Sequence, residues 1–277
     1  MDTLSPSELE AYQLCPFRYY AQSVLKLKAE VRNEVEMTPP ETGRMLHKIL
    51  EGLLSKGPVT RERGREILAH EIASFQKERP HISSVLLELH QRRIERTLDS
   101  FIEDYETERG EERSLTPRFF EWSFVMDEPP IRLRGRVDRI DVDEKQKRFL
   151  VIDYKTGSTK ISGNRVRSGE ALQLPLYILA VKRLLLPDYE PIGGLYYQLS
   201  DMSKCDGILH AERLPEFLEI HPRSSSLVPA VKWESTFESI QEKVRLIVAE
   251  IQKGLFPSRT EPCDPYCPYQ DICRIRA

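Results

Sequence analysis

The sequence predicts an α/β protein in which a helical region precedes a sheet-containing core and a cysteine-rich tail follows it. Up to about position 117, apolar side chains recur at helical spacing with charge on the opposite faces. From Arg118 onward, alternating apolar and polar residues rich in β-branched side chains indicate strands. Three of the five cysteines crowd the last 15 residues. These observations favour an α/β core with additional structure at both ends.

Composition and charge are those of an ordinary globular protein. The 277 residues, 40% hydrophobic and 31% charged, suffice for one large domain or for a core with an appended helical part. No apolar run approaches a membrane span and the N-terminus lacks the features of a signal peptide, so we expect a cytoplasmic protein with no membrane partner. A net charge of −3 provides no overall attraction to nucleic acid. DNA binding would depend on local basic residues, which otherwise are solvated strand and loop side chains: Arg132, Arg134, Arg136, Arg139, Lys160, Arg165 and Arg167.

The first predicted helix has Ser5 as its N-cap, Pro6 in its first position and Glu8 three residues after the cap. It leads into an aromatic and thiol-bearing segment from Leu14 to Tyr20. The aromatic rings in this part of the chain are expected in the core rather than as stacking platforms for nucleobases.

Three further helices follow a polar linker from Arg32 to Glu41 and form a predicted helical cap. The first begins near Gly43 and has a stripe of leucine and isoleucine, with His47 at the edge of the stripe. On spacing alone, a structural or surface role for His47 is simpler than a ligand role. The next two helices run from Thr60 to Lys77 and from Ser84 to Glu108, and nothing in them suggests chemistry.

The centre of the core is a predicted antiparallel hairpin of two alternating strands. A turn centred between Lys145 and Gln146 places Asp138 directly opposite Asp153, with their Cβ atoms about 4.5–5.5 Å apart. Lys155 lies one step beyond Asp153 on the same face. One face of the hairpin is therefore expected to end in two carboxylates and an ammonium.

Two carboxylates this close repel each other unless a cation lies between them. A divalent, oxygen-seeking metal such as Mg²⁺ resolves the conflict. The metal could polarise a phosphoryl oxygen and lower the pKa of a water molecule, while Lys155 orients that water or neutralises charge on the phosphate. The pattern is typical of a phosphodiester hydrolase; the alternative is an exposed hairpin face whose charges are paired by chance.

Two segments flank the hairpin. A strand from Phe119 to Val125 precedes it and carries Glu121, which is either a third carboxylate of the site or an exposed strand residue. A loop from Thr156 to Arg167, rich in glycine, serine and lysine, follows the hairpin and suits either a phosphate backbone or solvent.

The rest of the core begins with an apolar helix from Glu170 to Leu184, in which Gln173 and Tyr177 share one face. Two strands and an amphipathic helix are predicted after it: Ile192 to Leu199, Phe217 to His221, and Glu234 to Lys253. The sequence contains no G-x-x-x-x-G-K-[ST] motif, so the chain has no nucleotide-driven motor of its own.

The cysteines are interpreted as metal ligands or buried thiols, because cytosolic proteins rarely contain disulfides. Cys263, Cys267 and Cys273 form a closely spaced triad that needs a fourth soft ligand to complete a zinc site or a cubane iron–sulfur cluster. Cys15, which is followed by a proline, is the natural candidate, whereas Cys205 stands alone. Isolated buried thiols are the alternative, and spacing does not decide between zinc and iron–sulfur.

The motifs occur in a specific order along nearly the whole chain: Ser5-Pro6-Ser7 with Cys15-Pro16-Phe17, Gly43-x-x-x-His47, Gly135-x-x-Asp138, Asp153-Tyr154-Lys155-Thr156-Gly157, Gln173-x-x-x-Tyr177, Gly254-x-Phe256-Pro257, and the cysteine triad. In this order they resemble the RecB-like branch of the PD-(D/E)xK nucleases. The resemblance is closest to the iron–sulfur nuclease domain of AddB-type proteins and their CRISPR-associated relatives.

The resemblance implies a restriction-endonuclease-like fold, in which a central mixed β-sheet is flanked by helices, with the N-terminal helical cap and a C-terminal cysteine cluster. We expect four parts in one compact unit: an N-terminal segment of residues 1–30 that supplies one cluster cysteine, a helical region of residues 31–117, a nuclease core of residues 118–256 and a cysteine tail of residues 257–277.

The resemblance also implies the roles of the site residues. Mg²⁺ or Mn²⁺ would be bound by His47, Asp138, Asp153, the backbone carbonyl of Ile152 and, as a further candidate, Glu121. Lys155 would assist the attacking water, and Gln173 and Tyr177 would lie beside it to contact DNA or support the lysine. A 4Fe-4S cluster, or zinc as the alternative, would be held by Cys15, Cys263, Cys267 and Cys273.

The activity implied is a Mg²⁺- or Mn²⁺-dependent deoxyribonuclease that acts on single strands or DNA ends, as an exonuclease, with a helicase or a CRISPR-associated protein as partner. The alternatives are a DNA-binding component of such a complex without turnover, and a zinc-stapled protein whose D-x-K motif is not catalytic. Two features depart from the family pattern. Val137 precedes Asp138 where the superfamily name has proline, and three residues separate Cys263 from Cys267 where relatives often have two.

Overall fold

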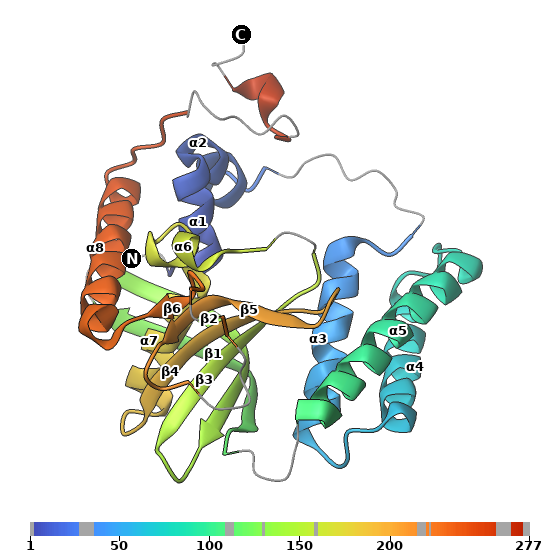
Figure 1. The fold of residues 1–277 in the computed structure, drawn as a ribbon. Coiled ribbons are helices and arrows are strands. Elements are labelled where there is room, and N and C mark those ends of the chain that lie inside the picture. Colours follow the sequence, from blue (N-terminus) through green and yellow to red (C-terminus); the bar gives the residue numbers. More distant parts are fainter. Residues whose placement is uncertain are drawn as a thin grey trace.

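The computed structural model describes residues 3–27, 36–108, 114–128, 131–157, 160–214, 220–221, 223–258 and 267–273. In this part of the chain a central sheet is covered by helices on both faces (Figure 1). Its buried apolar side chains form two clusters, one on each side of the sheet. The predicted α/β architecture is therefore confirmed.

Six strands of the described residues form one sheet in the order β1-β2-β3-β4-β5-β6. The strands are β1 (Thr116–Glu128), β2 (Ile131–Asp143), β3 (Arg148–Lys155), β4 (Glu190–Gln198), β5 (Ser203–His210) and β6 (Leu227–Val228). β3 is parallel to β4 and β5 is parallel to β6, whereas the other neighbours are antiparallel. The sheet is mixed, as expected.

Three parts of the strand prediction differ from the structure. The short β6 at Leu227 and Val228 was not predicted. β5 was not predicted, because Lys204, Asp206 and Gly207 leave no apolar alternation at its start. The strand expected from Phe217 to His221 lies mostly outside the described residues, and the described pair at its end, Ile220 and His221, is not in a strand.

The predicted register of the hairpin is confirmed along the paired part of β2 and β3, where Ile140 faces Val151. The pairing ends one step before Asp138 and Asp153. At that point a side chain takes the place of the backbone acceptor: Asp138 Oδ2 accepts the backbone N–H of Tyr154 at 2.8 Å. The two strands therefore separate where the two carboxylates lie.

Helices α3 (Pro39–Ser55), α4 (Arg61–Glu78) and α5 (Ser84–Glu108) cover one face of the sheet (Figure 1). α3 begins earlier than predicted, because Thr38 and Glu41 form a capping box. The hydroxyl of Thr38 accepts the N–H of Glu41 at 3.3 Å, and the Glu41 carboxylate accepts the N–H of Thr38 at 2.9 Å. The polar linker consequently ends at Thr38.

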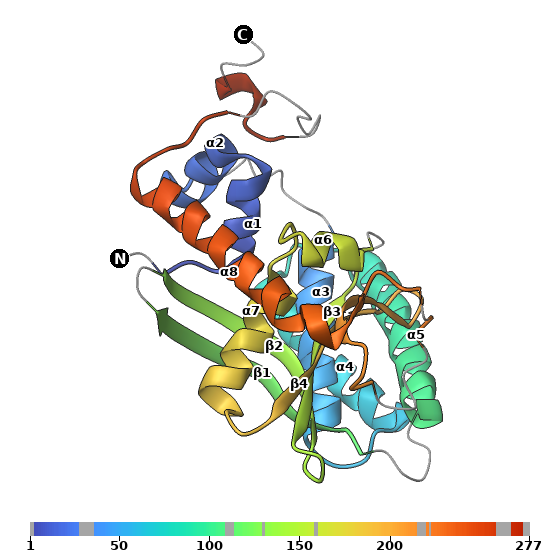
Figure 2. The same cartoon turned by 60° about the vertical axis from the view of Figure 1, so that its left-hand side comes forward.

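The opposite face carries α7 (Gln173–Ala180), its π-helical extension η2 (Val181–Leu185) and the long α8 (Ala230–Gln252), which runs beside α7 (Figure 2). α7 begins later than the predicted start at Glu170. A short helix, α6 (Gly163–Arg167), lies in the segment that was predicted as a loop.

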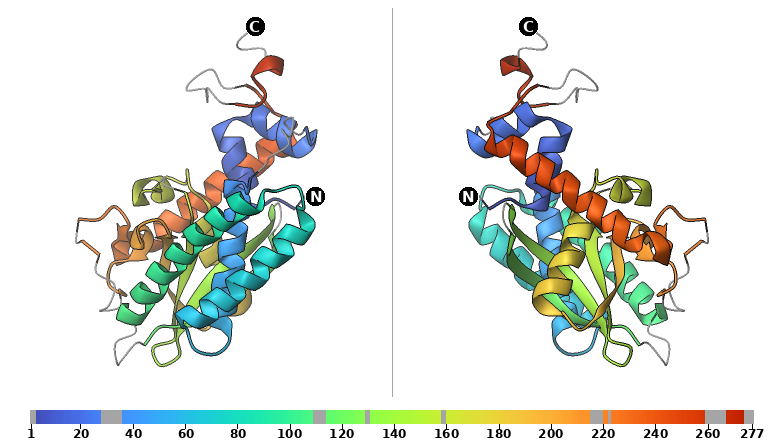
Figure 3. Two further views of the ribbon diagram at one scale, coloured as in Figure 1. Left: turned by 90° about the vertical axis from the view of Figure 1, so that its right-hand side faces the viewer. Right: turned by 90° about the vertical axis from the view of Figure 1, so that its left-hand side faces the viewer.

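The N-terminal helices α1 (Pro6–Leu14) and α2 (Pro16–Tyr19) pack at the end of α8, followed by the π-helix η1 (Tyr20–Val24) (Figures 2 and 3). The capping box of α1 is confirmed, with the hydroxyl of Ser5 accepting the N–H of Glu8 at 3.2 Å. Residue Leu4 adds to the free side of β2, because its N–H donates to the carbonyl of Arg132 and its carbonyl accepts from Arg134.

The chain after α8 returns to these N-terminal helices (Figures 1 and 3). The Tyr12 hydroxyl donates to the carbonyl of Leu255 at 2.6 Å, and the N–H of Phe17 donates to the carbonyl of Pro257 at 3.2 Å. Further along, a short 3₁₀ helix, η3 (Gln270–Ile272), follows Tyr269, whose hydroxyl donates to the carbonyl of Leu27. The two ends of the chain therefore lie side by side. None of the described helices is both long and apolar enough to cross a bilayer.

Candidate active site

His47, Glu121 and Asp138 form a compact group at the point where β2 and β3 separate. Each offers one ligand atom, and these atoms all lie within 4.8 Å of one another. His47 Nδ1 is 3.4 Å from Asp138 Oδ1 and 3.7 Å from Glu121 Oε1. In the part of the chain that the structure describes, this is the single group of three or more such residues at metal-binding distance.

The group draws on three elements. His47 comes from α3, Glu121 from β1 and Asp138 from β2. The edge position of His47 on its helix stripe is what lets the imidazole reach the end of the sheet. His47 therefore lies beside two carboxylates, and its role as a ligand stays a prediction.

Glu121 reaches the group through an irregular backbone. Its φ is +46°, a left-handed conformation that costs a residue with a side chain about 1–2 kcal/mol. Phe119 and Trp122 pack against the same core, three residues apart instead of two, so the alternation of β1 breaks at Glu121. Val137 and Ile140 show the same break around Asp138 in β2. Both carboxylates therefore lie where the two strands lose their regular alternation together.

Asp153 and Lys155 lie next to this group at the end of β3. Asp153 is 3% exposed, and its Oδ2 is 2.6 Å from Lys155 Nζ. Lys155 also donates to the side-chain oxygen of Gln173 at 2.8 Å, and the amide nitrogen of Gln173 is 3.4 Å from the Tyr177 hydroxyl. The predicted pair from α7 therefore lies beside the lysine, and Gln173 contacts it directly.

Burial and charge shift the titration of this site strongly. Burial disfavours the imidazolium of His47, but hydrogen bonds to Asp138 and Glu121 outweigh it and raise the pKa of His47 to about 10. Burial also disfavours the carboxylate of Asp153, and with the charge of Asp138 it raises the pKa of Asp153 to about 6, although Lys155 opposes the shift. Burial, followed by the charge of Asp153, likewise raises the pKa of Tyr177.

The donor set suits a hard divalent cation. Two carboxylates and one imidazole converge, and oxygen ligands are those that Mg²⁺ and Mn²⁺ prefer. Asp153 lies beside the group rather than in it, because its described contact is with Lys155. Ile152 is the last residue of β3 that pairs with β2, and its partner is Arg139. Its carbonyl therefore lies one residue from Asp153, at the point where β2 and β3 separate.

Two further residues neighbour the site. Arg136, which the hairpin register predicts beside Lys155, has its Nε 2.7 Å from Glu121 Oε2. Tyr196 was not expected there from the sequence. The Tyr196 ring lies under the lysine, with Lys155 Nζ 5.2 Å from the ring centroid, a distance suited to a cation–π contact. Tyr196 comes from β4, which no local pattern connects to the D-x-K motif.

The basic residues proposed for DNA contact divide into two groups. Arg139 is wrong as a DNA contact: it is 3% exposed and forms a bidentate pair with Asp141, with both N···O distances 2.6 Å. It is a buried structural residue, because β2 is covered on both faces at that point. Arg132, Arg134 and the basic residues of α6 lie on exposed or half-buried surface.

The cysteines are only partly described. Cys15 caps α2, since its sulfur accepts the N–H of Arg18 at 3.4 Å. Cys15, Cys267 and Cys273 are free thiols, and they do not come within 4.8 Å of one another as a group. Cys263 lies outside the described residues. The three described thiols therefore do not form a metal site by themselves.

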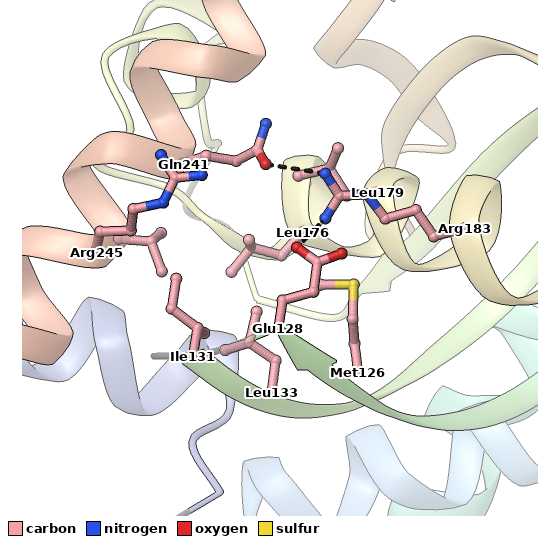
Figure 4. Close-up of a pocket in the computed structure, with 10 residues that line it drawn as sticks. Met126, Glu128, Ile131, Leu133, Leu176, Leu179, Arg183, Gln241 and Arg245 are labelled. Atoms are coloured by element: carbon pink, nitrogen blue, oxygen red, sulfur yellow. Dashed lines mark hydrogen bonds and ion pairs between the residues drawn. The ribbon is translucent and has the colours of Figure 1, made fainter.

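A pocket on the α7–α8 face lies away from this site, at the far end of β1 and β2 (Figure 4). Its floor is apolar, with Ile131 and Leu176 facing each other, and Arg183 closes its rim by contacting Glu128 and Gln241. None of the predicted site residues lines it. It has no group of side chains suited to phosphodiester chemistry.

Comparison with known proteins identifies the family of the chain. The family model described as PD-(D/E)XK nuclease superfamily matches residues 3–274. A subunit of an ATP-dependent helicase/deoxyribonuclease from Clostridium acetobutylicum is 26% identical over 98% of this chain and 30% of the relative. Proteins of the same name from Moorella thermoacetica and a Thermoanaerobacter species are 32% and 25% identical, over 70% and 98% of this chain and 19% and 30% of each relative.

This chain spans 30% or less of the length of these relatives. The matches confirm the AddB-type, RecB-like resemblance, and the mixed sheet flanked by helices agrees with a restriction-endonuclease-like fold. The chain belongs to the PD-(D/E)XK nuclease superfamily.

Proposed function

We propose that the chain is a Mg²⁺- or Mn²⁺-dependent deoxyribonuclease that hydrolyses phosphodiester bonds. The observation that carries the proposal is the convergence of His47, Glu121 and Asp138 within 4.8 Å, beside the buried Asp153 and the lysine that it holds. Carboxylates that approach one another in this way are stabilised by a cation between them, and a divalent metal can take the place that the His47 imidazolium otherwise holds.

In this proposal His47, Glu121, Asp138 and Asp153 would hold the ion, with the carbonyl of Ile152 as a further ligand. The ion would polarise a phosphoryl oxygen and lower the pKa of a bound water. Lys155 would orient the attacking water and neutralise charge that develops on the phosphate.

The support of Lys155 comes from the protein itself. Asp153 and Gln173 hold its ammonium from two sides, and Tyr196 covers it from below. A lysine fixed in this way presents its charge in one place, which is what a developing phosphate charge requires. Tyr177 keeps its proton, because its pKa is raised, and can donate a hydrogen bond to the substrate.

The substrate and partner follow from the relatives. Their name, which describes one subunit of a helicase/deoxyribonuclease, indicates DNA and a helicase, and we propose both for this chain, with a CRISPR-associated partner as the alternative. We propose single strands or DNA ends as the substrate and exonuclease cleavage as the activity. A pocket next to the site supports the proposal of a single-stranded substrate. It is lined by Leu46 and Thr156, the chain neighbours of His47 and Lys155, and by the exposed Arg93, whose charge suits a phosphate backbone.

The test is cleavage of end-labelled linear and circular single-stranded DNA with Mg²⁺ or Mn²⁺. We expect EDTA to abolish cleavage, and Asp153→Ala and Lys155→Ala to lose it while retaining the circular dichroism of the wild type. Lys145→Ala is the matched control, because Lys145 is exposed in the turn of the same hairpin. Undiminished cleavage by both site variants would refute the proposal. Cleavage of the circular substrate would refute the exonuclease part alone.

A second candidate is a DNA-binding component of a larger complex, without turnover. It predicts tight DNA binding and no cleavage with any divalent metal. The intact set of Asp138, Asp153 and Lys155 favours the enzyme, because a binding module has no need to bury two carboxylates beside an ammonium.

We also propose that Cys15, Cys263, Cys267 and Cys273 hold a structural 4Fe-4S cluster, with zinc as the alternative. The support is the contact between the chain ends, which places the helix that follows Cys15 next to the C-terminal tail (Figure 1). The site needs Cys263 to be complete, and no catalytic step depends on it.

The cluster proposal is tested by anaerobic purification with iron, sulfide and zinc analysis. A brown protein with stoichiometric iron and sulfide is expected, and Cys15→Ser should lose both. Cys205→Ser is the control, since that cysteine stands alone in the sequence. A colourless protein with stoichiometric zinc would establish the zinc alternative, and a protein with neither metal would refute both.

A further inference from the structure

We propose that Glu10 is a positioning residue that fixes Lys155 through the start of helix α7. The inference rests on the proposed nuclease function and adds a residue to it. One carboxylate oxygen, Glu10 Oε1, accepts the backbone N–H of Leu172 at 2.6 Å and that of Gln173 at 3.1 Å. Glu10 belongs to α1, more than 160 residues earlier in the chain.

The start of α7 needs an outside acceptor. Its N-cap residue is Leu172, which has no side-chain acceptor, so the first amides of the helix are left without partners. A carboxylate at a helix N-terminus satisfies such amides and interacts favourably with the helix dipole. Among the described residues Glu10 has no ion pair, so these amides are its described partners. The contacts identify its role as the cap of α7.

The capped residue is also the one that holds the lysine. Gln173 gives its backbone N–H to Glu10 and its side-chain oxygen to Lys155, whose ammonium is 2.6 Å from Asp153. A shift or fraying of the first turn of α7 would therefore move the Gln173 oxygen away from Lys155. Misplacement of a catalytic group by about 1 Å can lower the rate of an enzyme about 100-fold.

Glu10 is itself held in a fixed place relative to the sheet. Leu4, just before α1, hydrogen-bonds to β2, the strand that carries Asp138. Leu9 is fully buried, and the Tyr12 hydroxyl is anchored on the carbonyl of Leu255. α1 thus contacts both β2 and α7 and holds the two elements in place relative to each other. Together with the direct packing of α7 on β2, the Glu10 contact fixes where the start of the lysine-holding helix lies relative to the strand that carries Asp138.

The first test compares three variants by steady-state cleavage and Mn²⁺ titration. We expect Glu10→Ala to lower kcat about 10- to 100-fold, with KM for DNA and the affinity for Mn²⁺ close to wild type, because no ligand is touched. Glu10→Gln keeps an oxygen acceptor for the same two amides and should restore most of kcat. The matched control is Glu8→Ala, which removes the capping box of the same helix and its ion pair with Arg134 of β2 but leaves the contact with α7.

The second test separates positioning from general stability. If Glu10 acts through Gln173, then Glu10→Ala should lower kcat little further in a protein that already carries Gln173→Ala. If the two residues act independently, the losses in activation free energy would add. Hydrogen exchange of the Leu172 and Gln173 amides should also accelerate in Glu10→Ala and not in Glu8→Ala, a readout that needs no activity.

The outcomes are distinct. Equal kcat for Glu10→Ala and wild type, or additive losses in the double variant, would each overturn the positioning role. An inactive wild-type protein would overturn the proposed function instead, and the exchange of the two amides would then still show whether Glu10 caps α7.

Discussion

Asp153 shows what a single buried carboxylate does to this protein before any metal is bound. Its pKa is raised from 3.8 to about 6, so the folded protein binds this proton more tightly than the unfolded chain does. The free energy of unfolding therefore falls as pH rises from about 4 to about 6, and it stays lower above that window. The charge that the proposed metal would use is maintained at the expense of stability.

We therefore expect Asp153→Asn to be inactive and yet more stable than the wild type at pH 7.5 in EDTA. The gain should be about 1–3 kcal/mol, since each pKa unit corresponds to about 1.4 kcal/mol, and it should vanish near pH 4. Urea unfolding at the two pH values measures it. Asp127→Asn, at an exposed position of β1, is the control and should change neither value. A destabilised Asn variant at pH 7.5 would contradict this account.

Protonation of His47 affects the stability of the fold in the opposite sense, because its charged form is the stabilising one. Because its partners raise its pKa to about 10, the imidazolium stabilises the metal-free fold below about pH 6.5, and this contribution is lost as pH rises through about 10. At neutral pH the positive imidazolium of His47 thus lies between the carboxylates of Glu121 and Asp138, where a metal would otherwise bind. A metal that binds the His47 nitrogen must displace this proton.

Binding of Mn²⁺ at pH 7.5 is accordingly expected to release about one proton, and the affinity should rise with pH. Calorimetric titration in two buffers of different ionisation enthalpy measures the release. His47→Gln should bind the metal more weakly and release no proton from this position. The same heat of binding in both buffers for the wild type would show that His47 is not a ligand.

The site was predictable from the sequence only where its residues share one hairpin. The turn position was enough to place Asp138 near Asp153. His47 and Gln173 come from two helices on opposite faces of the sheet, so helix periodicity described their faces but not what they meet; the family resemblance supplied that. Arg139 was misjudged because alternation cannot show that β2 is covered on both sides.

At the scale of the elements, the first half of β2 packs closely against the helix that contacts Lys155. A Cβ on Gly135 would lie 2.6 Å from the Phe124 ring and 2.9 Å from the Tyr177 ring. These contacts are too close for any side chain, and both rings are buried. Gly135 therefore lets β2 approach α7, which explains why a glycine precedes Asp138 in the motif.

Gly135→Ala is expected to destabilise the protein by about 1–3 kcal/mol, the usual result of overpacking, and to lower cleavage by displacing Tyr177. Urea unfolding and cleavage assays measure the two effects. Gly157→Ala, in the neighbouring motif, is the stability control, because its Cβ would meet nothing within 4 Å. Equal unfolding midpoints for the two variants would contradict the close-packing explanation.

The elements themselves were largely readable from the sequence. The helices α4 and α5 follow from their apolar stripes, and the register of β2 with β3 follows from the turn. The break at Glu121 did not, because a left-handed residue other than glycine leaves no mark in the sequence. β5 was missed since its pairing with β4, rather than its own composition, makes it a strand.

At the scale of the whole molecule, the contact between the two chain ends holds the N-terminal helices in place. Phe256 is its centre, stacked on Tyr20 at 4.8 Å between ring centroids and close to Tyr12 and Tyr19. These tyrosines belong to or follow α1, which carries Glu10. The packing of the chain ends and the position of Lys155 are therefore linked through one helix.

Phe256→Ala tests this link. Removal of the ring should cost about 1–3 kcal/mol, less than for a fully buried phenylalanine because Phe256 is partly exposed, and should loosen α1. Hydrogen exchange should then accelerate both in α1 and at the start of α7, and cleavage should fall although every site residue is intact. Leu255→Ala is the matched control, since that side chain is 48% exposed while its carbonyl still accepts from Tyr12. The result that contradicts the link is faster exchange in α1 while exchange at Leu172 and cleavage are unchanged. The chain ends and the active site would then be independent.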